Sequence, residues 1–91
     1  MYEILFENKF KKDYKLAVKR GLKISLLEEV LKLLREEGKL PSKFKAHLLK
    51  GNYKGYWECH IQSDWLLIWK QEDDIKLVSL ARTGTHSDLF K

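Results

Sequence analysis

The spacing of apolar residues changes once along this chain, at a polar connection around Pro41. Before Pro41, apolar residues recur every three or four positions, which is typical of amphipathic helices. After it, three runs rich in β-branched and aromatic residues alternate with turn signals. This order predicts an α+β domain in which an N-terminal strand and two helices precede three antiparallel strands, and the helices cover one face of a single sheet.

The first stretch predicts a strand followed by a helix. Residues 2–6 alternate in polarity, which indicates a short strand. Asn8 is expected to cap a helix that ends at Gly21. The predicted buried face of this helix consists of Phe10, Tyr14 and Ala17, and its other face carries Lys11, Lys12, Lys15 and Lys19, which are candidate phosphate contacts.

The second helix has start and stop signals of its own. Ser25 and Glu28 have the spacing of a capping box, and Gly38 with Pro41 is expected to end the helix. Its predicted apolar stripe consists of Leu27, Val30, Leu31 and Leu34. The three strands are expected within residues 53–61, 65–70 and 75–81, with turns at 62–64 and 72–74.

Length and composition favour one domain spanning residues 1–91. The chain has 91 residues, of which 44% are hydrophobic, so it can bury a single core. Its one cysteine, Cys59, excludes an internal disulfide framework and agrees with a reducing compartment. No apolar run approaches the length of about 20 residues that crosses a bilayer, and the N-terminus does not resemble a signal peptide. We therefore expect a cytoplasmic protein without a membrane partner.

The positive charge is concentrated in the first part of the chain. The net charge is +5, and residues 1–54 hold 14 Lys and Arg against seven acids. Such a distribution favours a polyanionic partner, although a solvated lysine-rich surface is the simpler alternative. Lys50 and Lys54 add two basic side chains near the predicted sheet.

Three histidines lie in the second half of the chain, which suggests acid–base chemistry. Because an imidazole titrates near neutral pH, it can both remove and donate a proton. RNA cleavage by its own 2′-hydroxyl needs a base, an acid and a fixed cation, and His60, His86 and Arg82 could fill these roles. The sequence does not determine which histidine is the base and which is the acid, and we favour His60 as the base and His86 as the acid. His47 could equally be a merely exposed residue. The histidine spacing matches no compact zinc motif, so we expect neither a metal nor another cofactor.

Other side chains leave more than one interpretation open. Glu58 and His60 are expected on one strand face and Cys59 on the other, which disfavours a Cys–His nucleophile and favours a packed thiol. Arg82 could instead pair with Asp64 or Asp88. Rings on which a base could stack belong to Tyr53, Tyr56, Trp57, Trp65 and Phe90, whereas Trp69 is expected in the core.

Four ordered runs resemble the YafQ family of toxins, a branch of the RelE/ParE superfamily from bacterial type II toxin–antitoxin modules. These runs are residues 47–56 (HLLKGNYKGY), 58–60 (ECH), 64–70 (DWLLIWK) and 82–90 (RTGTHSDLF). The resemblance implies a RelE-like fold and an mRNA endoribonuclease that acts in the ribosomal A site and is inhibited by an antitoxin. The family's functional positions correspond to His47, His60, Asp64, Arg82, His86 and Phe90, with an acidic residue at Glu58 and an aromatic one at Trp65.

Two other functions remain compatible with the sequence. A non-catalytic RNA- or ribosome-binding protein could use the same basic and aromatic surface. A ParE-like toxin directed at gyrase would have the same fold, because fold alone does not decide function. The set of histidine, aspartate and arginine residues favours the ribonuclease.

Overall fold

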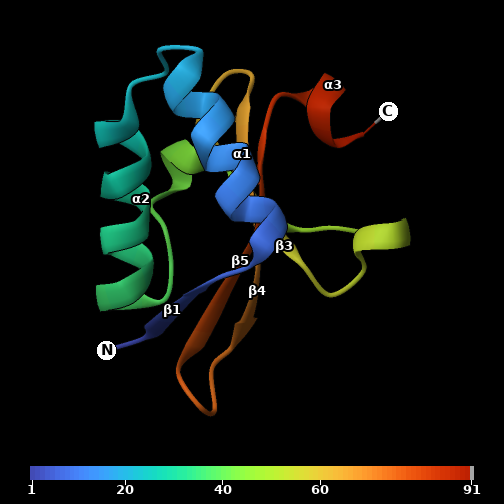
Figure 1. Cartoon of the computed structure of the whole chain (residues 1–91). Coiled ribbons are helices and arrows are strands. Elements are labelled where there is room, and N and C mark those ends of the chain that lie inside the picture. Colours follow the sequence, from blue (N-terminus) through green and yellow to red (C-terminus); the bar gives the residue numbers. More distant parts are fainter. Residues whose placement is uncertain (91) are drawn as a thin grey trace.

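A computed structural model describes residues 1–90, which form one five-stranded sheet with helices (Figure 1). The strands are β1 (Glu3–Phe6), β2 (His47–Leu48), β3 (Trp57–Gln62), β4 (Trp65–Glu72) and β5 (Leu77–Gly84). The α-helices are α1 (Asn8–Lys19), α2 (Ile24–Glu37) and α3 (His86–Leu89), and two short 3₁₀ turns span Ser42–Phe44 and Gly51–Tyr53. The predicted α+β class and order of elements are confirmed.

The strand order in the sheet is β1-β5-β4-β3-β2. The three predicted strands β3, β4 and β5 pair antiparallel as neighbours, as expected. The first strand of the chain pairs with the last one in parallel, with Ile4 opposite Val78. This pairing places β5 inside the sheet, and the sequence pattern did not predict it.

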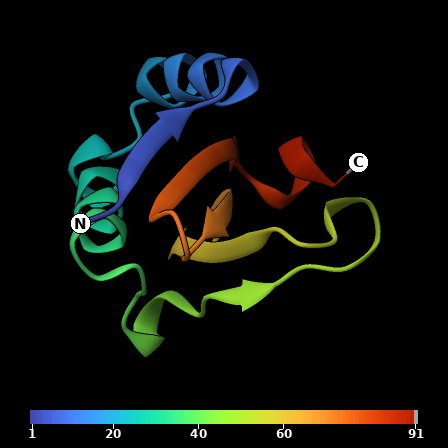
Figure 2. The same cartoon turned by 90° about the horizontal axis from the view of Figure 1, so that it is seen from below.

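Helices α1 and α2 cover one face of the sheet, as predicted (Figure 2). Their buried residues, which include Phe10, Leu27 and Val30, join a core with the inward side chains of the strands, such as Leu67 and Leu80. A second, smaller core lies on the other face and consists of Leu66, Ile68, Ala81 and Leu89. Because α3 contributes Leu89 to this second core, it is fastened to the face that α1 and α2 leave open.

The ends of the two long helices differ in part from the expectations. Both α1 and α2 begin without a side-chain cap, and their N-cap residues are Glu7 and Lys23. The predicted cap at Asn8 and the predicted capping box of Ser25 and Glu28 are therefore wrong, because these residues lie inside the helices. The expected ends hold: α1 stops just before Gly21, and Gly38 takes the left-handed conformation after α2.

Strand bounds also shift relative to the expectations. The run predicted from residue 53 becomes a strand only at Trp57, because Gly51–Tyr53 forms a 3₁₀ turn instead. Trp57 stacks on Trp69, with ring centroids 6.2 Å apart, at the margin of the helix-covered core. None of the helices within residues 1–90 is long and apolar enough to cross a membrane.

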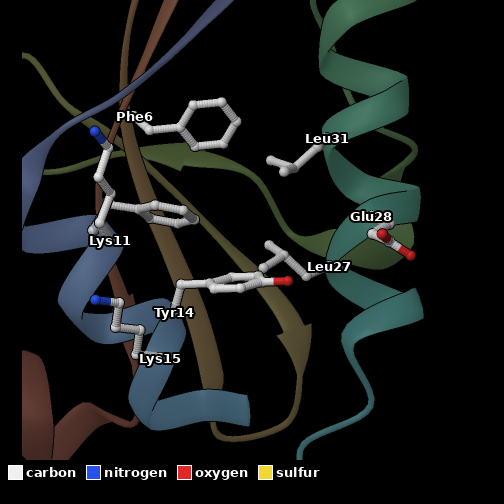
Figure 3. Close-up of a pocket in the computed structure, with 8 residues that line it drawn as sticks. Phe6, Lys11, Tyr14, Lys15, Leu27, Glu28 and Leu31 are labelled. Atoms are coloured by element: carbon white, nitrogen blue, oxygen red, sulfur yellow. The ribbon is translucent and has the colours of Figure 1, made fainter.

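An apolar groove of about 490 Å³ separates α1 from α2 (Figure 3). Tyr14, predicted as part of the buried face of α1, is 37% exposed because its ring lines this groove. The rest of the lining comes from both helices and the end of β1: Phe6, Phe10, Lys11, Lys15, Leu27, Glu28 and Leu31. Lys11 and Lys15 therefore border a groove in the helical layer.

Candidate active site

The register of the sheet brings four residues into one row across the strands. His47 on β2 lies opposite Glu58 on β3, Glu58 lies opposite Ile68 on β4, and Ile68 lies opposite Arg82 on β5. Directly opposed residues share a sheet face, and Ile68 belongs to the core on the face away from α1 and α2. The row therefore collects three predicted site residues on the open face.

His47 and Glu58 form the first histidine–carboxylate pair. Nε2 of His47 lies 3.3 Å from Oε1 of Glu58, and Nδ1 of His47 donates to the backbone carbonyl of Lys45 at 2.9 Å. Because a carbonyl only accepts, Nδ1 carries a hydrogen, and Nε2 is the ring nitrogen that faces the carboxylate. The other oxygen of Glu58, Oε2, is buried and has no hydrogen-bond partner within residues 1–90. A hydrogen-bond donor that reaches Oε2 would therefore remove the energetic cost of this unpaired oxygen.

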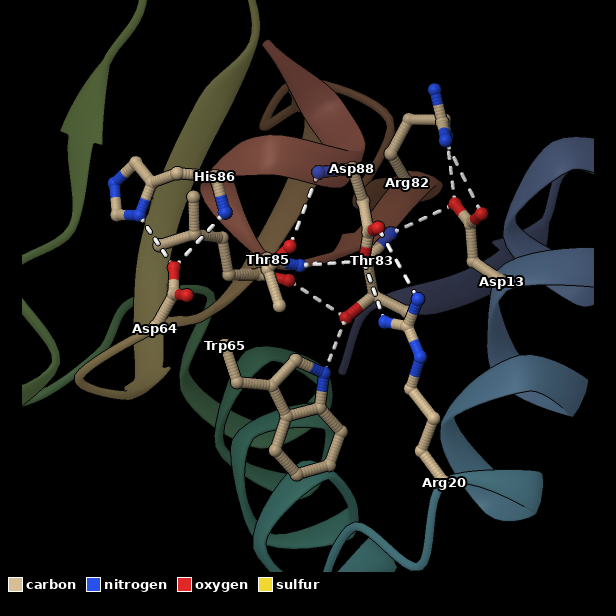
Figure 4. Close-up of polar contacts among 10 residues, drawn as sticks. Asp13, Arg20, Asp64, Trp65, Arg82, Thr83, Thr85, His86 and Asp88 are labelled. Carbon is tan, nitrogen blue, oxygen red and sulfur yellow. Dashed lines mark hydrogen bonds and ion pairs between the residues drawn. The ribbon is translucent and has the colours of Figure 1, made fainter. Parts of the chain in front are cut away.

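His86 and Asp64 form the second pair (Figure 4). Asp64 lies in the turn between β3 and β4, and its Oδ1 accepts both the backbone N–H of His86 at 3.0 Å and the ring Nδ1 at 2.7 Å. The backbone hydrogen bond and, to a smaller extent, the side-chain hydrogen bond hold the pKa of Asp64 below its usual range. Nδ1 is therefore the donor to Asp64, which leaves Nε2 of His86 for a substrate.

His60 completes the histidine cluster. It lies on β3 two residues after Glu58, on the same face, and its ring centroid is 5.9 Å from that of His86. Two histidines that are distant in sequence are therefore close enough to act on one substrate group, as the sequence predicted.

The partner of Arg82 is Asp13, so the alternative of a pair with Asp64 or Asp88 is wrong. Arg82 donates from Nε to Oδ2 of Asp13 at 2.7 Å and from Nη2 to Oδ1 at 3.2 Å (Figure 4). Asp13 also accepts the backbone N–H of Thr83 at 3.1 Å. The bond to Asp13 raises the pKa of Arg82 above its usual value. Arg82 is therefore a fixed, permanently charged group whose Nη1 is not used by Asp13.

A capping box fixes the short helix that begins at His86. This cap was not among the expectations from the sequence. Thr85 caps α3 by accepting from the N–H of Asp88, and Asp88 accepts the N–H of Thr85 in return. Arg20, the C-cap residue of α1, donates to both carboxylate oxygens of Asp88, at 2.7 and 3.3 Å. The bond from Arg20, followed by that from Thr85, strongly lowers the pKa of Asp88. The Thr-x-x-Asp spacing was the sequence signal for this cap.

Aromatic rings border the histidines on one side. Phe90 follows α3, is 44% exposed, and meets Tyr53 edge to face with centroids 5.8 Å apart. Its ring centroid is 6.4 Å from that of His86. Figures 1 and 2 both show that α3 and the loop carrying Tyr53 lie on the side of the molecule away from α2. Phe90 thus offers an accessible ring next to His86.

Trp65 does not lie where a base could stack on it. Its side chain is 2% exposed in the core beneath the helices, and its Nε1 donates to Oγ1 of Thr83 at 2.9 Å (Figure 4). Oγ1 of Thr83 in turn donates to the carbonyl of Leu66 at 2.7 Å. Trp65 supports the strand next to Arg82 and is not a surface ring, so the expectation of a direct substrate contact is wrong.

The predicted basic contacts divide into two groups. Lys50 and Lys54 are exposed on the loop that carries Tyr53, beside the aromatic edge of the site. Lys12 and Lys19 are exposed on α1, and Lys11 and Lys15 border the groove between α1 and α2. The lysines of α1 thus belong to the helical layer, whereas the histidines lie on the opposite face of the sheet.

Cys59 is a packed core residue, as its alternation with His60 predicted. It is fully buried against the helices, and burial, followed by the charge of Glu58, raises the pKa of its thiol to about 12. The thiol is therefore un-ionised near neutral pH and is not a nucleophile. Across residues 1–90, no group of three or more His, Cys, Asp or Glu side chains is arranged to hold a metal ion.

The five-stranded sheet with α1 and α2 on one face is an α+β domain of the RelE-like class. The family model described as the bacterial toxin of type II toxin–antitoxin systems, YafQ, matches residues 2–91. The chain belongs to this YafQ toxin family.

Relatives match along nearly the whole chain. The mRNA interferase toxin YafQ of Escherichia coli strain K12 is 40% identical over 89 residues, which cover 97% of this chain and 95% of the relative. A crystal structure of the E. coli DinJ–YafQ complex matches with a TM-score of 0.90 and 39% identity, covering 100% of both chains. A metal-bound toxin from Helicobacter pylori matches with a TM-score of 0.89 and 40% identity, covering 99% of this chain and 100% of the other.

Proposed function

We propose that this protein is an mRNA interferase, a toxin endoribonuclease that cleaves mRNA and is neutralised by a cognate antitoxin. The observation that carries this proposal is the convergence of two histidine–carboxylate pairs and an anchored arginine on one face of the sheet. The relatives named mRNA interferase toxin support it, since each matches 97% of the chain.

The proposed reaction is a transfer of the phosphate to the neighbouring 2′-hydroxyl. A base removes the 2′-hydroxyl proton, the 2′-oxygen bonds to phosphorus, and the bond to the 5′-oxygen breaks. An acid gives its proton to the departing 5′-oxygen, so the products are a 2′,3′-cyclic phosphate and a free 5′-hydroxyl. Base and acid each contribute roughly 100- to 10,000-fold in rate.

We assign the acid to His86 and the base to His60. The bond from Nδ1 to Asp64 orients the imidazole of His86 and leaves Nε2 as the nitrogen that meets the departing 5′-oxygen. The ring of His60, 5.9 Å from that of His86, is near enough to serve the other side of one phosphate. The paired side chains of His47 and Glu58 lie on the same face and support the base.

Arg82 stabilises the charge that develops on the phosphate. Its guanidinium is held by Asp13, so Nη1 can meet the phosphorane without reorganisation. A nucleobase of the RNA stacks on the ring of Phe90, and Lys50 and Lys54 contact phosphates along the RNA. These side chains supply the base, acid and cation, so the proposed reaction uses no metal or other cofactor.

The proposed cellular setting is the cytoplasm, with the message held in the ribosomal A site. The charge of +5 favours contact with mRNA and ribosomal RNA. The complex of the E. coli relative with DinJ supports a protein antitoxin as the second partner.

Primer extension on a defined message tests the proposal. The purified protein is incubated with the message in the presence and absence of translating ribosomes, beside the variants H60A and H86A. We expect cleavage only by the wild-type protein, and only when translating ribosomes are present. The variant S87A, which alters an exposed neighbour in α3, is the matched control and should cleave normally.

Two outcomes would support other functions. Growth arrest that persists in H60A and H86A without cleavage of messages would favour an RNA-binding toxin that does not cut. DNA damage without message cleavage would favour a gyrase-directed toxin with the same fold.

A further inference from the structure

We infer that α1 is a positioning element for the catalytic face: Asp13 and Arg20 hold residues 82–88 at both ends, and so fix His86 against Asp64. This inference rests on the proposed function only for its effect on RNA cleavage. The two anchors themselves are the pairs Asp13–Arg82 and Arg20–Asp88.

The spacing of the two anchors on α1 matches the segment that they hold. Asp13 and Arg20 are seven positions apart, which is about two helical turns, so both project from one side of α1. The two ion pairs have opposite polarity (Figure 4). In one pair the acidic Asp13 of α1 holds Arg82, and in the other the basic Arg20 at the end of α1 holds Asp88. The segment between these two contacts contains Thr83, Thr85 and His86.

The short helix α3 depends on such anchors. Its four residues are far fewer than an isolated helix needs in water. It is held by Leu89 in the second core, by the bonds between His86 and Asp64, and by Arg20. Gly84 leaves room for this arrangement, because a Cβ there would lie 2.9 Å from Oδ2 of Asp88.

The contact of Arg20 acts on His86 through the capping box. Oδ2 of Asp88 accepts from both Arg20 and the N–H of Thr85, and Thr85 is the N-cap of the helix that begins at His86. Arg20 thus fixes the start of α3, and the start of α3 directs the ring of His86 toward Asp64. Without Arg20, the position of His86 is set less sharply, and a misplacement of about 1 Å can lower a rate about 100-fold.

The test compares R20A with K23A, which removes the same charge from an exposed residue three positions further along the chain. In R20A we expect kcat for RNA cleavage to fall between about 10- and 100-fold, with KM within about twofold of wild type. R20K should recover part of the lost kcat, and K23A should retain the wild-type kcat. A rise of KM in R20A with an unchanged kcat would instead identify Arg20 as a phosphate contact and would overturn the inference.

Amide hydrogen exchange provides a readout that does not depend on cleavage. The amides of His86, Leu89 and Phe90 bond to Asp64, Thr85 and His86 respectively. In R20A these amides should exchange at least about 10-fold faster than in wild type, while those of β4 stay protected. Unchanged exchange in α3 would overturn the inference. If the wild-type protein cleaves no RNA, the proposed function fails, and hydrogen exchange still decides whether Arg20 anchors α3.

Discussion

Oδ1 of Asp64 accepts two hydrogen bonds from a single residue, the backbone N–H and the ring Nδ1 of His86. One oxygen therefore fixes both the position of the residue and the tautomer of its ring. Asp64 comes from the turn between β3 and β4, whereas His86 begins α3 after β5. The orientation of the His86 ring thus depends on a turn 22 residues earlier in the chain.

Removing the carboxylate of Asp64 should impair catalysis more than substrate binding. In D64A we expect kcat to fall about 100-fold, because the ring of His86 loses the group that orients it. S63A, in the same exposed turn, is the control. Steady-state cleavage of a defined RNA measures the effect, and a normal kcat in D64A alongside an inactive H86A would contradict the role given to Asp64.

Acid should destabilise the protein through Asp64 and Asp88. The pKa of each is lower in the folded protein than the value of about 3.9 for an unfolded aspartate. Their stabilisation is therefore present above about pH 4 and is lost as the pH falls below it. Urea unfolding from pH 6 to pH 2 measures this loss. D88N should be less stable than wild type at pH 6 and should lose less stability toward pH 2.

Cys59 should resist thiol reagents in the folded protein. Its thiol is fully buried and its pKa is raised to about 12. We expect alkylation at pH 8 at least about 100-fold slower than in urea, since reaction requires opening of the core. Mass spectrometry of the alkylated protein follows the rate. Rapid labelling without denaturant would show that β3 is not packed beneath the helices.

Phe90 and Trp65 should respond to substitution in opposite ways. F90A should weaken RNA binding by about 1 to 3 kcal/mol with little change in stability, because its ring is exposed. W65F should cost about 1 to 3 kcal/mol of stability by leaving Oγ1 of Thr83 without its donor. Thermal unfolding and RNA titration separate the two effects. Equal loss of RNA binding in a folded W65F would contradict its structural role.

Salt dependence should distinguish the loop lysines from those of the groove. If Lys50 and Lys54 each neutralise a phosphate, the substitutions K50A and K54A each reduce the slope of log affinity against log salt by about 0.7. K11A, in the groove between α1 and α2, is the control and should leave the slope unchanged. Affinities for a single-stranded RNA at several salt concentrations provide the slopes.

Much of the fold was predictable because each feature depended on local patterns. Helical spacing identified α1 and α2, and the turn signals separated β3, β4 and β5. Alternation correctly put Glu58 and His60 opposite to Cys59. The expectation of a stacking ring at Trp65 was wrong, because residues 65–69 are all buried, and a strand that is apolar throughout does not show in its sequence which of its rings reach the surface.

The missed features depend on contacts between distant parts of the chain. Asp13 lies 69 residues before Arg82, and no local pattern identifies this carboxylate as the partner. The parallel pairing of β1 with β5 also has no sequence signal, since the apolar pattern of each strand fits a parallel and an antiparallel neighbour equally well. Ser25 and Glu28 had the spacing of a cap and lie inside α2, whereas Thr85 and Asp88 have a similar spacing and do cap a helix.

The pairing of β1 with β5 has a consequence for the order of events during synthesis. The first strand made cannot find its neighbour until residues 77–84 have emerged from the ribosome, and Arg82, His86 and Phe90 emerge with or just after them. The sheet and the candidate active site are therefore completed only after residues 77–90 have emerged. Until then, a nascent chain of this protein has no assembled candidate site.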